Sequence, residues 1–153
     1  EIPLQQELDL LRRYLDIMEI RFQGRLEITT DVQQRAMDAL VPNLILQPIV
    51  ENAIKHGVSK IEDVGRIALR SRVDGGQLVL TVENNAPLTD VGNASGDGTG
   101  VGVRNTRARL SHLYGDEQSF DLRAGDGGAT IAEIRLPYHT RADLRTSAVV
   151  SFA

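Results

Sequence analysis

Hydrophobic side chains recur every three or four residues near the start of the chain. This spacing places them on one side of a helix, and they are Leu4, Leu8, Leu11, Leu15, Met18 and Phe22. Pro3 suits the first turn of such a helix and Gly24 suits its end. The stripe predicts either a helix packed on the core of the domain or a helix seam that continues from a missing upstream region.

A second helical pattern occupies residues 41–57, with the sequence VPNLILQPIVENAIKHG. The apolar positions that fit a helix there are Leu44, Ile45, Ile49, Val50, Ala53 and Ile54. Pro48 lacks a backbone N–H, so this helix must begin near it or kink there. A third helix is predicted over residues 103–114 and is ended by Gly115.

Alternating apolar and polar residues predict the strands. The segment RLEITT predicts a short strand, and residues 65–84 and 119–137 each predict a hairpin, with glycine-rich turns at 74–76 and 125–128. The predicted order is helix, strand, helix, two strands, loop, helix and two strands. This order favours an α+β fold, a two-layer α/β sandwich in which a mixed, mostly antiparallel sheet carries helices packed on one face.

Composition narrows the classes of function. The chain has 153 residues, of which 41% are hydrophobic, with a net charge of −4 and no cysteine. Its length fits one domain with a buried core, and the lack of cysteine excludes thiolate chemistry and favours a cytoplasmic setting. No apolar run approaches the roughly 18 residues of a membrane span. No basic stripe is interleaved with aromatic residues, so no nucleic-acid partner is expected.

Glycines are concentrated just before the third predicted helix. Residues 85–101 have almost no apolar periodicity and predict a long loop. Gly98, Gly100 and Gly102 alternate at its end, where a helix N-terminus supplies unpaired backbone N–H groups and a positive dipole end. The combination favours phosphate binding, and a flexible connector is the alternative. No Lys-Ser/Thr pair follows, which excludes a P-loop, and the preceding hairpin argues against a dinucleotide fingerprint.

The segment ENAIKHG places four polar side chains within little more than one helical turn. Asn52 shares a helix face with Lys55 and His56, at spacings of three and four residues. An amide oxygen and a cation on one face suit Mg²⁺ and phosphate, because Mg²⁺ keeps several waters and takes few protein ligands. A solvated polar face that ends in a His-Gly cap is the alternative.

Two further positions become informative only in combination. Asn84 and Asn85 end an apolar strand directly before the long loop, where a side chain can face a pocket beneath it. Turn chemistry explains asparagine there equally well. Thr130 follows the Gly127-Gly128 turn at the start of a strand and by itself needs no functional explanation.

Together these four stretches resemble the N, G1, G2 and terminal Gly-Thr boxes of one family of ATP-binding domains. DNA gyrase, a heat-shock chaperone, sensor histidine kinases and the mismatch-repair protein MutL share this domain. The segments LILQPIVENAIKHG and GTGVGVRNTRARLSHLYG are most similar to those of LytS-type sensor histidine kinases. The resemblance covers about residues 4–137 and implies the Bergerat fold, with ATP held between helices and a mobile lid.

The resemblance also implies roles for individual residues. Asn52 matches the Mg²⁺ ligand of the N box, and Lys55 and His56 match positions that approach the phosphates. Glu51 precedes the asparagine and is a candidate for orienting water or the metal, so Glu51 and Lys55 are the candidate catalytic residues. Thr130 matches a threonine that helps to hold adenine. The residues matched to the segment that closes over the triphosphate, or offers it backbone N–H groups, are Gly98, Gly100, Val101, Gly102 and Val103. The implied cofactors are ATP and Mg²⁺.

The G1 box departs from the family pattern Asp-x-Gly. Asn84 stands at the aspartate position and Ala86 at the glycine position. The Asn84 Oδ1 atom can accept a hydrogen bond from the adenine amino group, but the lost charge assistance weakens that bond by roughly 1 kcal/mol. Ala86 restricts the backbone if a positive φ is required there. Weaker nucleotide binding is therefore expected.

The resemblance further implies which partners the chain needs. None of the three histidines, His56, His112 and His139, lies in a context like that of a phosphoryl acceptor. The chain therefore resembles the catalytic half of a two-component kinase, whose acceptor histidine lies on its own upstream dimerisation domain and which signals to a response regulator. The implied full-length protein is a membrane-attached homodimer, and this domain is cytoplasmic.

The resemblance also implies how the chain is divided into segments. Residues 1–24 form a helix that continues from a missing upstream region, and residues 25–137 form the ATP-binding domain with a lid at 85–103. Residues 138–153 are a tail without clear pattern, expected to be disordered.

Two other functions remain open. The changes at Asn84 and Ala86 fit a degenerate Bergerat-fold interaction module with weak or no ATP turnover. An ATPase like gyrase would need an acidic general base one helical turn before Asn52, and Pro48 occupies that position.

Overall fold

A single five-stranded sheet organises the molecule. The computed structural model describes residues 1–88 and 99–144. The strands are β2 (Leu26–Val32), β4 (Gly65–Asp74), β5 (Gln77–Asn84), β6 (Ser119–Ala124) and β7 (Thr130–Pro137). Their order in the sheet is β2-β4-β5-β7-β6, in which β2 and β4 are parallel and every other pair is antiparallel.

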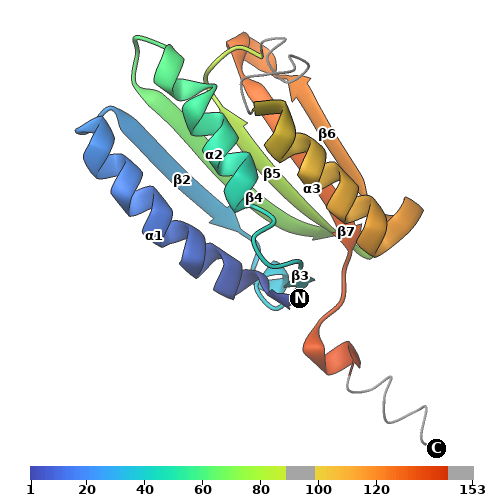
Figure 1. The fold of residues 1–153 in the computed structure, drawn as a ribbon. Helices are drawn as coiled ribbons and strands as arrows, with labels where there is room; N and C mark the ends of the chain where they lie inside the picture. Colours follow the sequence, from blue (N-terminus) through green and yellow to red (C-terminus); the bar gives the residue numbers. More distant parts are fainter. Residues whose placement is uncertain (89–98, 145–153) are drawn as a thin grey trace, which may run out of the picture.

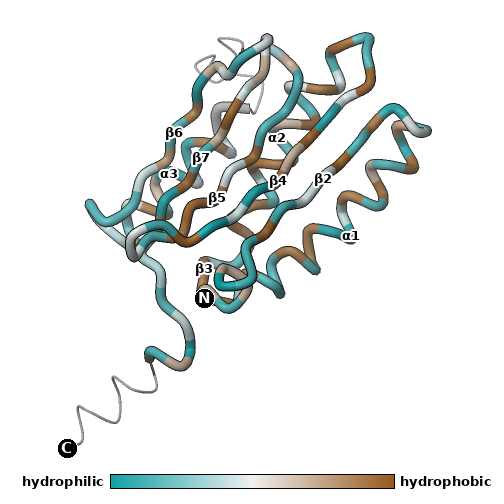
Figure 2. Tube along the Cα trace, turned by 180° about the vertical axis from the view of Figure 1, so that it is seen from behind, coloured by the Kyte–Doolittle hydropathy of each residue, from teal (hydrophilic) through white to brown (hydrophobic). Residues whose placement is uncertain are grey.

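Three helices lie side by side on one face of this sheet (Figure 1). They are α1 (Leu4–Phe22), α2 (Gln47–Lys55) and α3 (Thr99–Tyr114). Seen from behind, the strands lie in front of the helices and their hydrophobic and hydrophilic residues alternate (Figure 2). The predicted α+β two-layer sandwich, with a mixed and mostly antiparallel sheet covered on one face, is confirmed.

The core lies between the helices and the sheet. Alternate residues of the central strands face the helices and are buried, such as Leu78, Leu80 and Val82 of β5. From α1, Leu4, Leu11 and Leu15 are buried, which confirms the core-packing interpretation of its stripe; the other predicted stripe residues, Leu8, Met18 and Phe22, are partly buried against the same core. Each such buried side chain stabilises the fold by about 1.5–3 kcal/mol.

The hairpin turns follow the glycines. Gly75 and Gly76 have φ of 55° and 82°, the left-handed pair that a two-residue hairpin turn requires, and Asp74 pairs with Gln77 across it. The second predicted hairpin is also present, with Gly127 and Gly128 at φ of 69° and 81°. Both hairpin predictions are confirmed.

The helix boundaries differ from the predicted ones. Helix α2 begins at Gln47 with Pro48 in its first turn, so Leu44 lies outside it, with φ of 57°. The proline sets this start, because it tolerates the first turn but not the interior of a helix. Helix α3 begins at Thr99, four residues before the predicted start, so Gly100 and Gly102 belong to its first turns instead of to a loop.

Two short strands and several 3₁₀ turns complete the fold. Strand β1 (Ile2–Pro3) pairs antiparallel with β3 (Leu40–Val41). The 3₁₀ turns are η1 (Gln34–Ala36), η2 (Val58–Lys60), η4 (Gly115–Glu117) and η5 (Asp126–Gly128). Two-residue strands are too short to show alternation, which is why the sequence gives no sign of the β1–β3 pair.

The first residues of the predicted tail pack against the domain. The Leu40 N–H donates to the His139 carbonyl at 2.9 Å, and the Tyr138 hydroxyl donates to the Arg35 carbonyl at 3.0 Å. Residues 145–153 lie outside the described part of the chain. None of the helices in the described part is long and apolar enough to cross a membrane.

Candidate functional site

The predicted site elements meet at one edge of the sheet. In Figure 1 the C-terminal end of α2, the N-terminal end of α3, the end of β5 and the start of β7 all lie at the upper edge. Asn84 ends β5 and pairs directly with Thr130, the first residue of β7. The fold therefore brings the four sequence boxes together, although they are far apart in the chain.

Helix α2 divides its polar residues between two flanks. Its buried residues Ile49, Val50, Ala53 and Ile54 face the sheet. At 100° per residue, Asn52 and His56 fall on one flank of this buried stripe, Glu51 falls on the other, and Lys55 points away from the sheet. The predicted shared face of Asn52 and His56 is thus consistent with the packing of the helix, whereas Glu51 is separated from it.

Asn52 carries an acceptor that the described residues leave unsatisfied. Its Oδ1 atom is buried and accepts no hydrogen bond from the part of the chain that the structure describes. Leaving a buried acceptor unpaired costs about 1–3 kcal/mol, so the atom is suited to an occupant that supplies the missing partner. An amide oxygen is a hard ligand of the type that Mg²⁺ prefers.

The side chains available as metal ligands also limit how a metal ion could be bound at Asn52. Within residues 1–88 and 99–144 there is no group of three or more His, Cys, Asp or Glu side chains that could hold a metal ion. A cation at Asn52 would therefore need most of its ligands from water and from a bound anion. Mg²⁺ with a nucleotide triphosphate meets this condition.

Asn84 is buried, and its side chain is already engaged. It is 6% exposed, and its Oδ1 atom accepts the Ala86 N–H at 2.9 Å. A backbone N–H must face oxygen, so this bond fixes the orientation of the amide and leaves Nδ2 as its other polar atom. The expected acceptor for adenine is thus occupied by an internal hydrogen bond, with only its second lone pair remaining.

Gly57 allows α2 to approach Asn84 closely. A Cβ atom at Gly57 would lie 2.4 Å from the Ala53 carbonyl oxygen and 3.1 Å from Asn84 Oδ1. Any larger residue would push the end of α2 away from β5. Gly57 is therefore required for the close packing of α2 against β5, in addition to ending the helix.

Ala86 and Thr130 are hydrogen-bonded to each other at the same edge of the sheet. The Thr130 hydroxyl donates to the Ala86 carbonyl at 2.8 Å, and Ala86 is 2% exposed. Gln23 and Leu44 are the non-glycine residues with positive φ in the described part of the chain. Ala86 is not one of them, so the strain considered from the sequence does not arise.

Asn85 has a structural role. Its Oδ1 atom accepts the Arg66 N–H at 2.7 Å, and its Nδ2 atom donates to the Val64 carbonyl at 2.8 Å. Both bonds tie the end of β5 to the start of β4. These long-range bonds account for Asn85, whereas the bond from the Ala86 N–H to Asn84 Oδ1, two residues earlier, is the local turn chemistry considered from the sequence.

The N-terminal end of α3 lies at this edge. Because the helix begins at Thr99, the N–H groups without a carbonyl four residues earlier belong to its first residues, such as Gly100 and Val101, and the Val103 N–H is directed toward the Thr99 carbonyl. Gly102 and Val103 lie in the first turns of the helix, and a Cβ atom at Gly102 would have no heavy atom within 4 Å. The Thr106 hydroxyl donates to the Gly102 carbonyl at 3.0 Å. Gly100 and Val101 lie in the same helical segment, whereas Gly98 lies outside the described residues.

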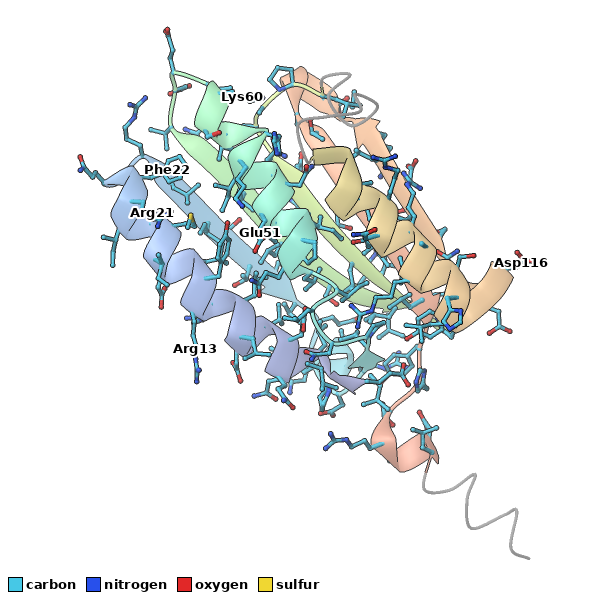
Figure 3. All side chains as sticks on the ribbon, viewed as in Figure 1. Arg13, Arg21, Phe22, Glu51, Lys60 and Asp116 are labelled. Carbon is cyan, nitrogen blue, oxygen red and sulfur yellow. The ribbon has the colours of Figure 1, made fainter. Side chains whose placement is uncertain are left out.

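Glu51 lies toward α1 instead of toward the candidate site. Its Oε1 atom accepts from Gln47 Nε2 at 3.1 Å. Burial and then the charge of Glu51 raise the pKa of Tyr14 on α1, and Figure 3 shows Glu51 between the two helices. The structure does not bring Glu51 together with Asn52, so its geometry does not favour the expected role in orienting water or the metal.

Sequence reasoning missed Glu7, which contacts the segment before α2. Its carboxylate is 1% exposed and accepts two backbone N–H groups there. The available signal was its position, three residues after Leu4 and four before Leu11, on the apolar stripe of α1. A carboxylate on a buried stripe is rarely there without a partner.

Comparison with known proteins places this arrangement in a family. The family model described as Histidine kinase-, DNA gyrase B-, and HSP90-like ATPase matches residues 37–140. The chain is 37% identical over 142 residues to the sensor histidine kinase BtsS of Escherichia coli K12, covering 92% of this chain and 25% of that protein. It is 30% identical over 146 residues to the sensor protein LytS of Enterococcus faecalis, covering 89% and 25%. The chain thus spans about a quarter of the length of these relatives.

Solved structures show the same fold. The nucleotide-free catalytic domain of the histidine kinase ThkA aligns with a TM-score of 0.63 at 12% identity, over 84% of this chain and 90% of that one. Full-length ShkA in complex with AMPPNP aligns with a TM-score of 0.58 at 22% identity, over 92% and 32%. The family model and the curated relatives establish that the chain belongs to the histidine kinase-, DNA gyrase B- and HSP90-like ATPase family and is similar to LytS-type sensor histidine kinases.

Proposed function

We propose that this chain is the catalytic domain of a two-component sensor kinase, which binds Mg-ATP and passes the γ-phosphoryl group to a histidine on a separate acceptor domain. The observation that carries the proposal is the buried Oδ1 atom of Asn52, which has no hydrogen-bond partner among the described residues and belongs to the helix that ends where α3, β5 and β7 converge. The similarity to sensor histidine kinases and the AMPPNP complex of ShkA support it.

Each site residue has a role in this proposal. Asn52 Oδ1 would hold Mg²⁺, which neutralises phosphate charge and orients the triphosphate. Lys55 and His56, at the end of α2, would contact the phosphates. Asn84 and Thr130 would line the adenine end.

The first turns of α3 would supply the remaining stabilisation. Gly100, Val101, Gly102 and Val103 lie in the first turns of that helix, whose positive end favours anions. The N–H groups of Gly100 and Val101 have no carbonyl four residues earlier in the helix, so these two would be offered to the phosphates. Gly98 belongs to the same proposed segment. In the reaction the bond from the γ-phosphorus to the β–γ bridging oxygen breaks, a bond to an imidazole nitrogen forms, and ADP leaves. The protein mainly positions groups and neutralises charge in such a transfer.

The proposal extends to the rest of the protein. The acceptor histidine would lie on the protein's own upstream dimerisation domain, and the phosphoryl group would then pass to a response regulator. The full-length protein would be a membrane-attached homodimer with this domain in the cytoplasm. These partners follow from the similarity to sensor kinases, of which this chain spans about a quarter.

One observation favours a second candidate function. The internal bond from the Ala86 N–H to Asn84 Oδ1 occupies the acceptor that adenine would use. A domain with a weakened adenine contact fits an interaction module with little or no ATP turnover.

Titration with AMPPNP tests the nucleotide proposal. We expect saturable binding with Mg²⁺, and a loss of at least about tenfold in affinity, or about 1.4 kcal/mol, in Asn52→Ala. The exposed Asn105→Ala on α3 is the matched control and should bind as the wild type does. Absence of binding at millimolar AMPPNP would count against the proposal.

Phosphoryl transfer separates the two candidate functions. The chain is joined to the upstream domain of its own full-length protein and incubated with labelled ATP and Mg²⁺. Label on a histidine of that domain supports the kinase. Nucleotide binding without any label supports the interaction module.

A further inference from the structure

A buried carboxylate links the first helix to the helix that carries Asn52. Glu7 of α1 is 1% exposed within an otherwise apolar stripe. Its two oxygens are both used: Oε2 accepts the Leu44 N–H at 2.9 Å and Oε1 accepts the Leu46 N–H at 3.1 Å. Charged side chains are almost never fully buried without such partners.

The segment that Glu7 binds has an unfavourable backbone conformation. Leu44 has φ of 57°, in the left-handed region that a side chain with a Cβ atom adopts only at a cost. Hydrophobic burial compensates only in part at this residue, because it is 45% exposed. The hydrogen bond to Glu7 therefore stabilises a turn that the local sequence does not favour.

The same carboxylate completes the N-terminus of α2. Leu46 is the residue before the helix, and its side chain makes no capping hydrogen bond. The first N–H groups of a helix have no partner within the helix, and a negative charge there is favourable with the helix dipole. Glu7 supplies both the acceptor and the charge from a different helix.

The position of Asn52 depends on this attachment. Asn52 lies five residues after Gln47, or about 8 Å along the helix axis. Helix α2 has only nine residues, so it is too short to hold its position without tertiary contacts. A change in the turn at Leu44 would move the whole of α2, and Asn52 with it.

We propose that Glu7 is a positioning residue, whose two backbone hydrogen bonds set the placement of α2 and thereby aim Asn52 Oδ1 for Mg²⁺. This inference rests on the proposed function. It predicts that replacing one of the two Glu7 carboxylate oxygens lowers the metal-dependent part of nucleotide affinity, which is the gain in AMPPNP affinity when Mg²⁺ is added. A purely structural role would lower thermal stability and leave that part unchanged in the folded molecules.

Glu7→Gln is the most discriminating change. Glutamine has nearly the same shape, but one acceptor oxygen becomes an NH₂ group that faces a backbone N–H. Glu19→Gln is the matched control, because Glu19 is exposed on the same helix. AMPPNP affinity is measured for the full 153-residue chain with and without Mg²⁺, together with the melting temperature.

We expect the ratio of the two dissociation constants, without and with Mg²⁺, to fall at least fivefold in Glu7→Gln and to stay unchanged in Glu19→Gln. An unchanged ratio in folded Glu7→Gln would overturn the inference. If Glu7→Gln does not fold, Glu7→Asp decides: its shorter carboxylate should lower the ratio, and a wild-type ratio overturns the inference. If the wild type binds AMPPNP equally with and without Mg²⁺, the proposed metal site itself fails, which is distinguishable from failure at Glu7 alone.

Discussion

Asn84 shows how far a single residue can be interpreted from sequence. Its place at the end of a strand beside the long loop allowed either a side chain that faces a pocket or local turn chemistry, and in the structure the side chain is buried beside Thr130. The bond from the Ala86 N–H to its Oδ1 atom, two residues on, is the turn chemistry that the sequence offered as the alternative. For Asn52 the prediction of a metal ligand remains, and the unpaired Oδ1 atom agrees with it.

Replacing Asn84 by aspartate should strengthen nucleotide binding. In Asn84→Asp one oxygen can keep the Ala86 N–H while the other accepts from adenine with charge assistance. The expected gain is about 1 kcal/mol, or roughly fivefold in ATP affinity by calorimetry. Asn85→Asp is the control: it removes the donor to the Val64 carbonyl, so it should lower the melting temperature without a gain in affinity. Unchanged affinity in Asn84→Asp would show that adenine does not contact this residue.

At the scale of elements, the reliable signals were those with a local physical cause. The Gly75-Gly76 pair specified its hairpin because both positions need positive φ. Pro48 specified where α2 can begin, but not that the preceding turn would be left-handed at Leu44. That turn depends on Glu7, which is 37 residues away in sequence from Leu44. Long-range polar contacts of this kind leave no periodic pattern in a single sequence.

Removing the Leu44 side chain from the turn before α2 should stabilise the protein. Leu44→Gly relieves the positive φ, and only partly buried surface is lost, so we expect a gain of up to about 1 kcal/mol in unfolding free energy. The same substitution at Leu10, which is 36% exposed within α1, should instead cost about 1 kcal/mol. Chemical denaturation measures both. A loss of stability in Leu44→Gly would mean that its side chain has a packing role that outweighs the strain.

At the scale of the whole molecule, a small polar cluster joins the two ends of the described chain. The Tyr114 hydroxyl donates to Glu1 Oε2 at 2.7 Å, and His139 Nε2 lies 3.1 Å from the same carboxylate. Burial raises the pKa of Glu1, but the hydrogen bonds from Tyr114 and His139 outweigh it and hold the pKa below its usual value. A carboxylate with a lowered folded-state pKa adds stability above its unfolded pKa, and this stability is lost as pH falls through the folded value.

Tyr114→Phe should therefore destabilise the protein in a pH-dependent manner. At neutral pH we expect a loss of about 0.5–1 kcal/mol in unfolding free energy, because one hydrogen bond to Glu1 is removed. The difference from wild type should shrink as the pH falls through the lowered folded-state pKa of Glu1, where the carboxylate becomes protonated. Tyr138→Phe is the control, because its hydroxyl donates to the Arg35 carbonyl, which does not titrate. Thermal unfolding across this pH range would contradict the prediction if both variants kept a constant difference from wild type.

The meeting of Glu1 and His139 has a practical consequence for work on this molecule. In Figure 1 the N-terminus and the end of β7, which shortly precedes His139, lie at the lower edge, whereas the end of β5 and the start of β7 lie at the upper edge. A fluorophore attached at Glu1 would therefore lie away from the upper edge, and a sample immobilised through that residue would present this edge to the solution.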